Sequence, residues 1–415
     1  MTHIFVHYHL RPGGVTRVIQ QQTSAFQQMG QRFVTISAGP QEAVCGEHRT
    51  WPALDYTAAG PLPLDELTAL VHDLPTPWIW HVHNPTLGCH PHMSALIHAM
   101  AHAGERMMLH LHDFAEDQRP HNLARLLSGP PWFPTGERIH YIVLTPRDRR
   151  VLTSAGLAEN QVTVVENPVI PCSIAPANSP ATRVLYPTRA ITRKNIGEML
   201  LLAALAPAGS RFATTMGPGK SQHQADYEHW QQLARDCRLP IDWAIAAHPH
   251  ASRTLEDCLA DSTHLLTTSA QEGFGMAFIE AIAWQRPLLG RAIPHIREAL
   301  AAHGIHHPAL YDRIEIDGID FAAQSLPLQT QLISRALAHP AAVIIHQNNL
   351  ALPASDWLTQ ALALPQTPLP LDLIAPFHPA KHAHTVIAIA RALAQAAASE
   401  VSALDAAMIR RAFTA

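Results

Sequence analysis

The sequence predicts two doubly wound α/β domains in tandem, facing each other across a cleft. Strand-like and helix-like segments alternate from His3 to Glu166, lapse at Pro168–Thr182, and then alternate again. Such alternation indicates parallel sheets covered on both faces by helices. The 415 residues suffice for two domains of about 100–200 residues each. Ligands of these sheets bind beyond the carboxyl ends of the strands, so the cleft is the expected active site.

In the first half, short apolar runs indicate strands, and amphipathic runs with a period near 3.6 indicate helices. The expected strands are His3–Leu10, Arg32–Ser37, Trp78–His83, Arg106–His112, His140–Thr145 and Val162–Glu166. The expected helices are Val15–Met29, Leu64–Leu74, Pro91–His102 and Arg147–Ala155. Residues 1–172 form the expected first domain, and Pro, Ser and Ala residues at 173–182 form the expected linker.

The second half repeats this alternation and predicts a second domain over 183–385. The expected strands are Val184–Tyr186, Phe212–Met216, Ile241–Ala246, His264–Thr268 and Pro287–Leu289. The expected helices are Asn195–Leu205, Asp226–Cys237, Leu255–Asp261 and Phe274–Trp284. The Pro-rich stretch His339–Pro379 gives no clear pattern, and Ala383–Phe413 is mostly helical.

Composition excludes several classes of function. Apolar residues make up 47% of the chain, and 29 Lys and Arg against 33 Asp and Glu leave a formal charge of −4. No basic excess is present to bind nucleic acid. The five cysteines include no C-x-x-C pair, which argues against a disulfide framework and favours a reducing compartment. No signal peptide is evident, and the longest apolar stretch, Met199–Pro207, is too short to span a membrane.

The segment from Ser269 to Ala281 carries the sharpest functional signal. It follows an expected strand, contains Gly273-Phe274-Gly275, and begins a helix. Glycines let the backbone approach a ligand, and the free N–H groups at a helix start suit a phosphate. Glu272 precedes the helix and can accept hydrogen bonds from sugar hydroxyls. Glu280, about two turns inside the helix, can reach a second polyol such as a ribose.

Glu272 and Glu280, with Gly-Phe-Gly between them, resemble the signature of retaining GT-B glycosyltransferases, specifically the large family 4. In that family the first Glu contacts the donor hexose and the second contacts the ribose of the nucleotide. The resemblance implies these roles for Glu272 and Glu280, and it implies the GT-B fold of two Rossmann-like domains.

A second segment, Leu185–Asn195, lies where the first strand of the second domain ends. Arg189 and Lys194, five residues apart, can both point at a diphosphate. Positive charge there would stabilise a departing nucleoside diphosphate. The family pattern is Gly-Arg, four residues, then Lys-Gly, and the chain has Thr188 and Asn195 at the two glycine positions.

Matches in the first half extend the resemblance. Gly13 and Gly14 follow the first strand, where the family has a Gly-Gly loop facing the donor phosphate and the acceptor. His112 ends another strand, where the family has a His near the donor sugar, and Asp113 is its neighbour in the loop. The remaining candidates are Arg17 as an acceptor contact, Asn167 as a structural residue, the acceptor loops His81–Gly88 and Phe114–Asn122, and Arg119 as a contact for an anionic acceptor.

Two other classes of function remain open at this level. His81-x-His83 and His110-x-His112 each place two imidazoles on one face of a strand, a spacing that suits metal ligands. That pattern would make the chain a metal-dependent amidohydrolase on an (α/β)₈ barrel. The other class is a sugar-binding or scaffold protein without activity. A nucleotide-sugar epimerase shares the GT-B architecture and is a related alternative.

Taken together, the resemblance implies a retaining hexosyltransferase that uses a nucleoside-diphosphate sugar and a small-molecule or lipid-linked acceptor. We expect no essential metal or other cofactor, because Arg189 and Lys194 would take the place of a metal ion, and no D-x-D motif occurs. We also expect a cytoplasmic protein, with peripheral membrane association left open. A tail helix at about 395–415 is expected to pack back onto the first domain.

Overall fold

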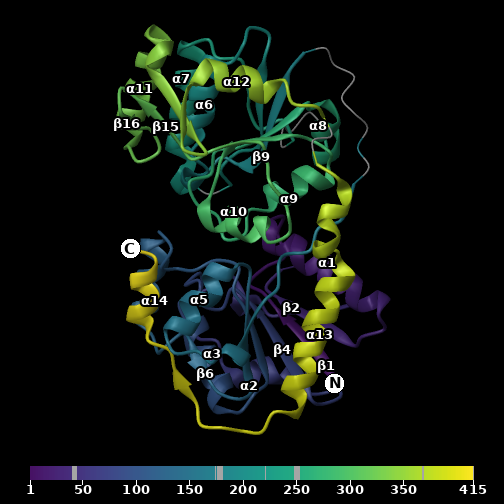
Figure 1. The fold of residues 1–415 in the computed structure, drawn as a ribbon. Coiled ribbons are helices and arrows are strands. Elements are labelled where there is room, and N and C mark those ends of the chain that lie inside the picture. The colour runs from purple at the N-terminus through teal and green to yellow at the C-terminus, as the bar shows by residue number, and fades with distance from the viewer. Residues whose placement is uncertain are drawn as a thin grey trace. The chain divides into compact units, whose positions relative to one another are not determined.

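The computed structural model describes residues 1–39, 44–172, 174, 181–219, 221–246, 253–366 and 369–414. The chain divides into two compact units, one formed by Met1–Ile170 with Pro376–Ala415 and the other by Pro171–Ala375 (Figure 1). The expected linker at 173–182 falls largely on residues outside the described ranges. The chain returns to the first unit at Pro376, whereas the sequence suggested about residue 395.

Within its described residues, the first unit is built on a parallel sheet of seven strands, in the order β3-β2-β1-β4-β5-β7-β8. These strands are β1 (Thr2–Val6), β2 (Phe33–Ser37), β3 (Glu47–Thr50), β4 (Trp78–His83), β5 (Met107–His110), β7 (Ile139–Val143) and β8 (Val162–Val164). The sequence did not predict β3, because its residues Glu-His-Arg-Thr are polar and partly exposed at the sheet edge.

Helices surround this first sheet. They are α1 (Gly14–Gln28), α2 (Leu64–Ala69), α3 (Met93–His102), α4 (Pro120–Leu127), α5 (Pro146–Ser154), α13 (Pro379–Gln395) and α14 (Ala406–Ala412), with 3₁₀ turns η1 (Pro52–Leu54) and η2 (Glu159–Gln161). The short strands β6 (Pro134–Thr135) and β19 (Ser402–Ala403) pair with each other and attach the C-terminal segment.

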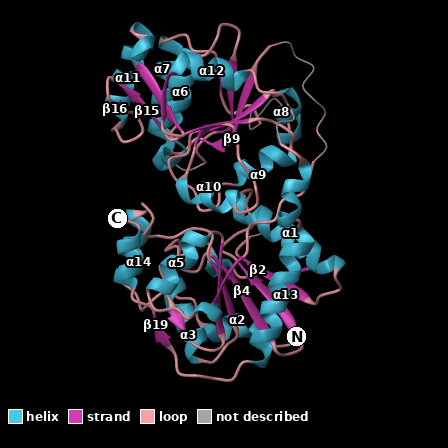
Figure 2. Cartoon of the chain, in the orientation of Figure 1, coloured by secondary structure: helices cyan, strands magenta, loops and turns pink. Residues whose placement is uncertain are grey.

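Six parallel strands form the main sheet in the described part of the second unit, in the order β11-β10-β9-β12-β13-β14 (Figure 2). They are β9 (Arg183–Arg189), β10 (Arg211–Met216), β11 (Ile241–Asp242), β12 (His264–Thr267), β13 (Leu288–Arg291) and β14 (Ala309–Tyr311). The helices are α6 (Ile196–Leu205), α7 (Gln224–Asp236), α8 (Leu255–Asp261), α9 (Met276–Ala283), α10 (Pro294–Ala301), α11 (Leu326–Ala338) and α12 (Ala354–Leu362), with turns η3 (Thr192–Lys194), η4 (Ser221–His223), η5 (Pro340–Ala342) and η6 (Leu371–Phe377).

A small antiparallel sheet, which the sequence did not predict, completes the second unit. Its strands are β15 (Arg313–Ile316), β16 (Ile319–Asp320), β17 (Val343–Gln347) and β18 (Leu350–Pro353). Two tight turns connect them, at Asp317-Gly318 and at Asn348-Asn349, and all four residues have positive φ. Such turns match the twist of paired antiparallel strands, and Asn, Asp and Gly are the residues that tolerate them.

In both main sheets the order of the strands reverses beside the first strand. In the first unit β1 lies between β2 and β4, and in the second unit β9 lies between β10 and β12. Open α/β sheets bind ligands beyond the carboxyl ends of the strands at such a reversal. The two open sheets confirm the predicted α/β class, and they exclude the closed (α/β)₈ barrel of the amidohydrolase alternative.

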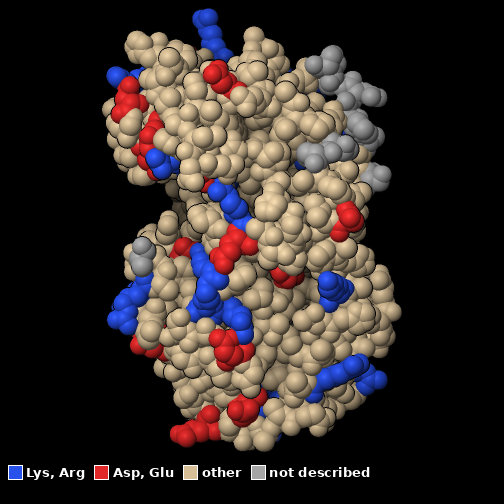
Figure 3. All heavy atoms as spheres, viewed as in Figure 1, with Lys and Arg blue, Asp and Glu red and all other residues tan. Residues whose placement is uncertain are grey.

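The distribution of charged side chains on the surface and the lengths of the apolar helices agree with the composition. On the face drawn in Figure 3, the basic and acidic side chains are interspersed among neutral residues and do not gather into one basic field. In the described part of the chain, no helix combines the length and the apolar character needed to cross a bilayer.

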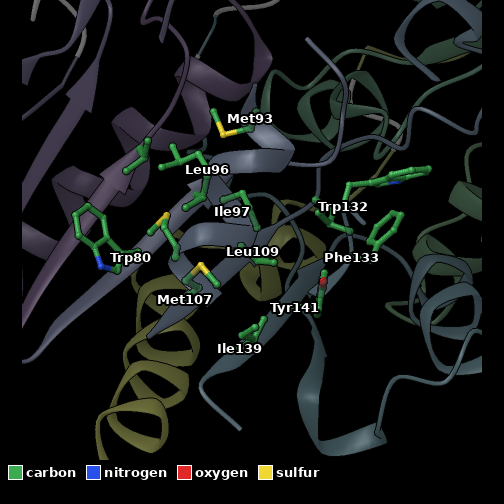
Figure 4. Close-up of a cluster of buried hydrophobic side chains, with 14 of the residues drawn as sticks. Trp80, Met93, Leu96, Ile97, Met107, Leu109, Trp132, Phe133, Ile139 and Tyr141 are labelled. Atoms are coloured by element: carbon green, nitrogen blue, oxygen red, sulfur yellow. The ribbon is translucent and has the colours of Figure 1, made fainter. Parts of the chain in front are cut away.

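The core of the first unit has two layers, one on each face of the sheet. Trp80, Met107, Leu109 and Tyr141 point into one layer, where they pack with Met93 and other residues of α3 (Figure 4). The opposite layer is formed by alternate residues of the same strands, packed against α1 and α13. It comprises Phe5, Ala25, Phe26, Ile79, Met108, Ile142, Val165, Ala383, Val386, Ile387, Ala390 and Leu393. The sheet face under α13 is therefore the one to which His81, His83 and His110 also point.

Candidate functional site

The turn after β9 carries two cations, Arg193 and Lys194, at the strand reversal of the second unit. The turn η3 ends at Asn195, whose φ of 48° places it in the left-handed region that Asn tolerates better than most residues. The neighbouring strand fixes this turn. Thr268 Oγ1 donates to the Lys194 carbonyl at 2.9 Å, and the Ala270 amide donates to the Arg193 carbonyl at 3.0 Å.

Both cations contact Glu272, which follows β12. Lys194 Nζ forms an ion pair with Glu272 Oε1, and Arg193 Nη1 lies 3.0 Å from Glu272 Oε2. Ser269 Oγ also donates to Glu272 Oε1 at 2.7 Å. Burial by itself raises the pKa of Glu272, but Lys194 and Arg193 outweigh burial and lower this pKa to about 2. The carboxylate is therefore ionised throughout the physiological range.

Arg193 is the functional candidate that the sequence analysis missed. The family spacing draws attention to Arg189 and Lys194, and the structure places Lys194 in contact with Glu272. Arg189 ends β9 and lies beside Gly219, where a Cβ would be 3.8 Å from Arg189 Nη1. The signal that could have found Arg193 is its position next to Lys194 in a short turn.

The connection from Glu272 to α9 explains the Gly-Phe-Gly sequence. Gly275 caps the helix with φ of +70°, and a Cβ there would lie 2.7 Å from Ile296 Cδ1, so both the backbone and the neighbouring side chains favour glycine. Gly273 is in the bend before it, and Phe274 is buried. Glu280 lies inside α9 and is only 8% exposed.

The divergent segment after α9 also reaches this site. His295, at the start of α10, has its Nε2 atom 2.9 Å from the Glu272 carbonyl oxygen, so the ring donates to that carbonyl. His295 therefore helps to hold the loop that carries Glu272, although the sequence of residues 285–295 departs from the family pattern.

The buried carboxylate of Glu198 supports the turn that carries Arg193 and Lys194. Glu198 is fully buried on α6, and its Oε2 atom lies 2.6 Å from Arg291 Nη2 of β13. Tyr311 OH and Asn195 Nδ2 donate to the same carboxylate at 2.5 and 2.8 Å. Burial alone lowers the pKa of Arg291, but Glu198 outweighs burial and raises it. The left-handed Asn195, and with it the turn of Arg193 and Lys194, is thus tied to the sheet.

In the first unit, the loop after β1 carries the predicted Gly-Gly pair. Gly13 caps α1 with an extended backbone, and a Cβ added to Gly14 would have no neighbour within 4 Å. The folding of this unit therefore does not by itself require glycine at either position. The Arg17 amide donates to the Gly13 carbonyl at 3.0 Å, which is an ordinary first turn of a helix.

His112, the predicted first-unit candidate, lies in a group of buried imidazoles. Its Nε2 atom is 2.9 Å from His83 Nδ1. Asn84, in the left-handed region with φ of 54°, accepts from the amides of His112 and Asp113 at 2.7 and 3.2 Å. Burial lowers the pKa of His112 to about 3, although Asn167 beside the ring opposes this. The ring is therefore neutral at physiological pH.

One curated protein resembles part of this chain in sequence. No family model matches the sequence. Mannosylglucosyl-3-phosphoglycerate synthase from Petrotoga mobilis is 24% identical over 262 residues, which are 57% of this chain and 50% of that protein. The chain thus spans about half the length of the curated relative it matches.

Three solved structures resemble nearly the whole chain. Sucrose-phosphate synthase from Thermosynechococcus elongatus has a TM-score of 0.61 and 14% identity, and the match covers 94% of this chain and 98% of that one. A glycosyltransferase from Rickettsia africae has a TM-score of 0.57 and 14% identity, with 95% and 98% covered. HepE from Anabaena in complex with UDP-glucose has a TM-score of 0.57 and 13% identity, with 94% and 99% covered. The chain has the fold of these GT-B proteins.

Proposed function

We propose that this chain is a retaining glycosyltransferase, similar to family 4, that transfers a hexose from a nucleoside-diphosphate sugar to an acceptor. The observation that carries the proposal is the group formed by Arg193, Lys194 and Glu272 at the strand reversal of the second unit. Two cations beside a helix start suit a diphosphate, and the carboxylate suits sugar hydroxyls. The fold shared with sucrose-phosphate synthase and with HepE bound to UDP-glucose supports this assignment.

Donor binding would exchange the partners within this group. The diphosphate would take Lys194 and Arg193 from Glu272, together with Arg189 at the end of the same strand. The freed Glu272 would then accept hydrogen bonds from the donor hexose, and Glu280 would accept them from the ribose. The exchange leaves each of these charged groups with a polar partner, which matters because both partners of the Lys194–Glu272 pair are less than a fifth exposed.

The transfer step follows from the charge that develops in it. The bond from the sugar C1 to the diphosphate oxygen breaks, and its electron pair remains on the phosphate. The acceptor oxygen attacks C1 from the same face through an oxocarbenium-like state and gives its proton to the departing phosphate oxygen. Fixed cations aimed at the departing diphosphate stabilise this transition state. Arg193 and Lys194 would fill that role without a divalent ion or other cofactor at the diphosphate.

The acceptor is proposed to be a small molecule bound by the first unit, with a lipid-linked acceptor as the alternative. The matched relative is named for a product built on 3-phosphoglycerate, which is a small anion. Arg119 of this chain pairs with Asp113 at 2.6 Å, and its buried Nε atom has no hydrogen-bond partner in the described part of the chain. Its guanidinium is the proposed contact for an anionic acceptor. We propose the cytoplasm as the compartment, in keeping with cysteines that form no disulfide in the described part of the chain.

The first experiment is a thermal-shift panel of nucleoside diphosphates and their sugars with the full chain. A ligand that binds only the native state raises the unfolding temperature. The donor found in this way is then incubated with phosphorylated and lipid-linked acceptors, without added divalent cations, and the products are analysed for the anomeric configuration. We expect a glycoside that keeps the configuration of the donor.

Other outcomes of the same assay would replace the proposal. Free hexose, or a changed sugar configuration without a glycoside product, would indicate an epimerase. Binding of a nucleotide sugar without turnover across the acceptors would indicate a scaffold. Inversion at C1 would refute the retaining mechanism, and a strict requirement for added magnesium or manganese would refute the role given to Arg193 and Lys194.

A further inference from the structure

Three imidazoles converge at the carboxyl ends of β4 and β5 in the first unit. The strand register pairs His83 with His110, and His112 follows two residues later on the same face. The ring centroids lie 4.8 Å apart for His83 and His110, 5.2 Å for His83 and His112, and 4.3 Å for His110 and His112. One nitrogen from each ring lies within 4.8 Å of the other two.

These rings are buried, and their hydrogen bonding is incomplete. His83 and His110 are each 1% exposed and His112 is 6% exposed. They share one hydrogen bond, between His83 Nδ1 and His112 Nε2. Among the described residues, His83 Nε2, His110 Nε2 and His112 Nδ1 have no hydrogen-bond partner. Buried polar atoms normally have partners. A neutral imidazole has one lone pair and one N–H, so the facing nitrogens of His83 and His112 can each turn a lone pair to a shared ion in place of their mutual hydrogen bond.

We propose that His83, His110 and His112 bind one zinc ion. Neutral imidazole nitrogens suit zinc and other late transition metals, whereas magnesium and calcium prefer oxygen ligands. Zinc binds imidazole nitrogen at about 2.0–2.1 Å in tetrahedral geometry, which separates two ligand nitrogens by about 3.3 Å. The 2.9 Å contact between His83 and His112 needs to open only slightly to reach that spacing.

The packing around the group supports a fixed site. His110 stacks on His382 of α13 with the ring centroids 6.1 Å apart, and His382 Nδ1 lies 2.9 Å from the Glu166 carbonyl oxygen. His83 and His110 lie on paired strands, and α13 packs against His110. These rings are therefore held in place before a metal binds. The ion would connect the ends of β4 and β5 and fix the tautomer of His112.

The site departs from the sequence-based expectation that the chain holds no metal. It belongs to the first unit and does not rest on the proposed glycosyl transfer, whose cations belong to the second unit. The two proposals are compatible. The proposed transfer step uses none of the three histidines as a diphosphate contact or a proton carrier.

The test measures the metal content of the full chain, produced without a histidine tag. We expect about one zinc per chain by elemental analysis. After removal of the metal with a chelator, Co²⁺ should restore one equivalent and give the visible absorption of four-coordinate cobalt. His110→Gln should retain little zinc and bind Co²⁺ at least about 10²-fold more weakly, because even residues that only support a ligand typically change affinity by 10–100-fold.

A matched control separates ligation from general effects on the sheet. His140 lies on the neighbouring strand β7, and its Nε2 atom is 2.9 Å from Thr163 Oγ1, so His140→Gln should keep full zinc content. Folding of both variants is checked by circular dichroism. If His110→Gln does not fold, Co²⁺ titration of the unmodified chain decides alone. A folded wild-type chain without bound metal and without the cobalt spectrum, or equal zinc in both variants, would overturn the proposal.

Discussion

Replacing Lys194 with Ala removes one of the two cations that contact Glu272. These cations lower the pKa of Glu272 from 4.5 to about 2 against the opposing effect of burial. At about 1.4 kcal/mol for each tenfold change, the net field at this position favours a negative charge by about 3 kcal/mol. Lys194→Ala removes only part of this field, since Arg193 and the Ser269 hydroxyl contribute to it. Losing one group that stabilises a developing charge typically costs about 10²–10³-fold in rate. We therefore expect Lys194→Ala to lower kcat/KM by about 10²-fold.

The assay is initial-rate transfer with the donor identified by thermal shift, measured with the variant and with a matched control. Lys381 is an exposed lysine on α13 in the other unit, so Lys381→Ala changes the net charge equally and should leave kcat/KM unchanged. A Lys194→Ala variant that folds and turns over at the wild-type rate would show that this cation does not act on the leaving group.

Three further predictions follow from the geometry of the second unit. Glu272 has a lowered pKa, so its contribution to stability is present above pH 4.5 and is lost as the pH falls toward 2. In urea unfolding, the difference in the free energy of unfolding between wild type and Glu272→Gln should therefore shrink over that range. A constant difference would contradict this prediction. Gly275→Ala should destabilise the unit by about 2–4 kcal/mol, because it combines a positive φ with a close contact, whereas Gly14→Ala should be nearly neutral in the same thermal unfolding experiment. Glu198→Ala leaves Arg291 buried without its carboxylate and should lower the free energy of unfolding by about 3–5 kcal/mol. The double variant Glu198→Leu/Arg291→Met should recover most of that loss. No recovery would mean that the unpaired charge of Arg291 is not the cause.

Local sequence signals pointed to several residues of the candidate group in the second unit. Glu272, Gly275 and Lys194 could be found because each lies after a strand, next to a turn or a helix start. The two strands, β9 and β12, are parallel neighbours, so their carboxyl ends lie at the same edge of the sheet. In the structure Gly275 has a positive φ, and Lys194 contacts Glu272. The α/β class could be predicted for the same reason, since alternating strand and helix patterns are local.

Contacts between distant segments could not be predicted. Glu198 and Arg291 are 93 residues apart, and no local sequence pattern around either residue predicts a buried ion pair. The two His-x-His pairs were visible, but only the register of β4 with β5 places His83 opposite His110. His81, from the same motif, pairs instead with His3, with its Nε2 atom 2.9 Å from His3 Nδ1.

Short antiparallel strands in the second unit were also missed. Each of β15 to β18 has at most five residues, and Pro-rich segments adjoin them, so no run is long enough to show a period of two. The turn residues Asp317-Gly318 were the local signal available, because Asp-Gly between apolar residues favours a hairpin.

Calorimetric titration of the matching nucleoside diphosphate into the wild-type chain and into the double variant Arg193→Ala/Lys194→Ala tests the central assignment most directly. Two charge-assisted contacts to phosphate are lost in the variant, so we expect the affinity to fall by at least about 10²-fold and the salt dependence of binding to weaken. Equal affinity and equal salt dependence in the two folded proteins would contradict the assignment of the diphosphate to this turn.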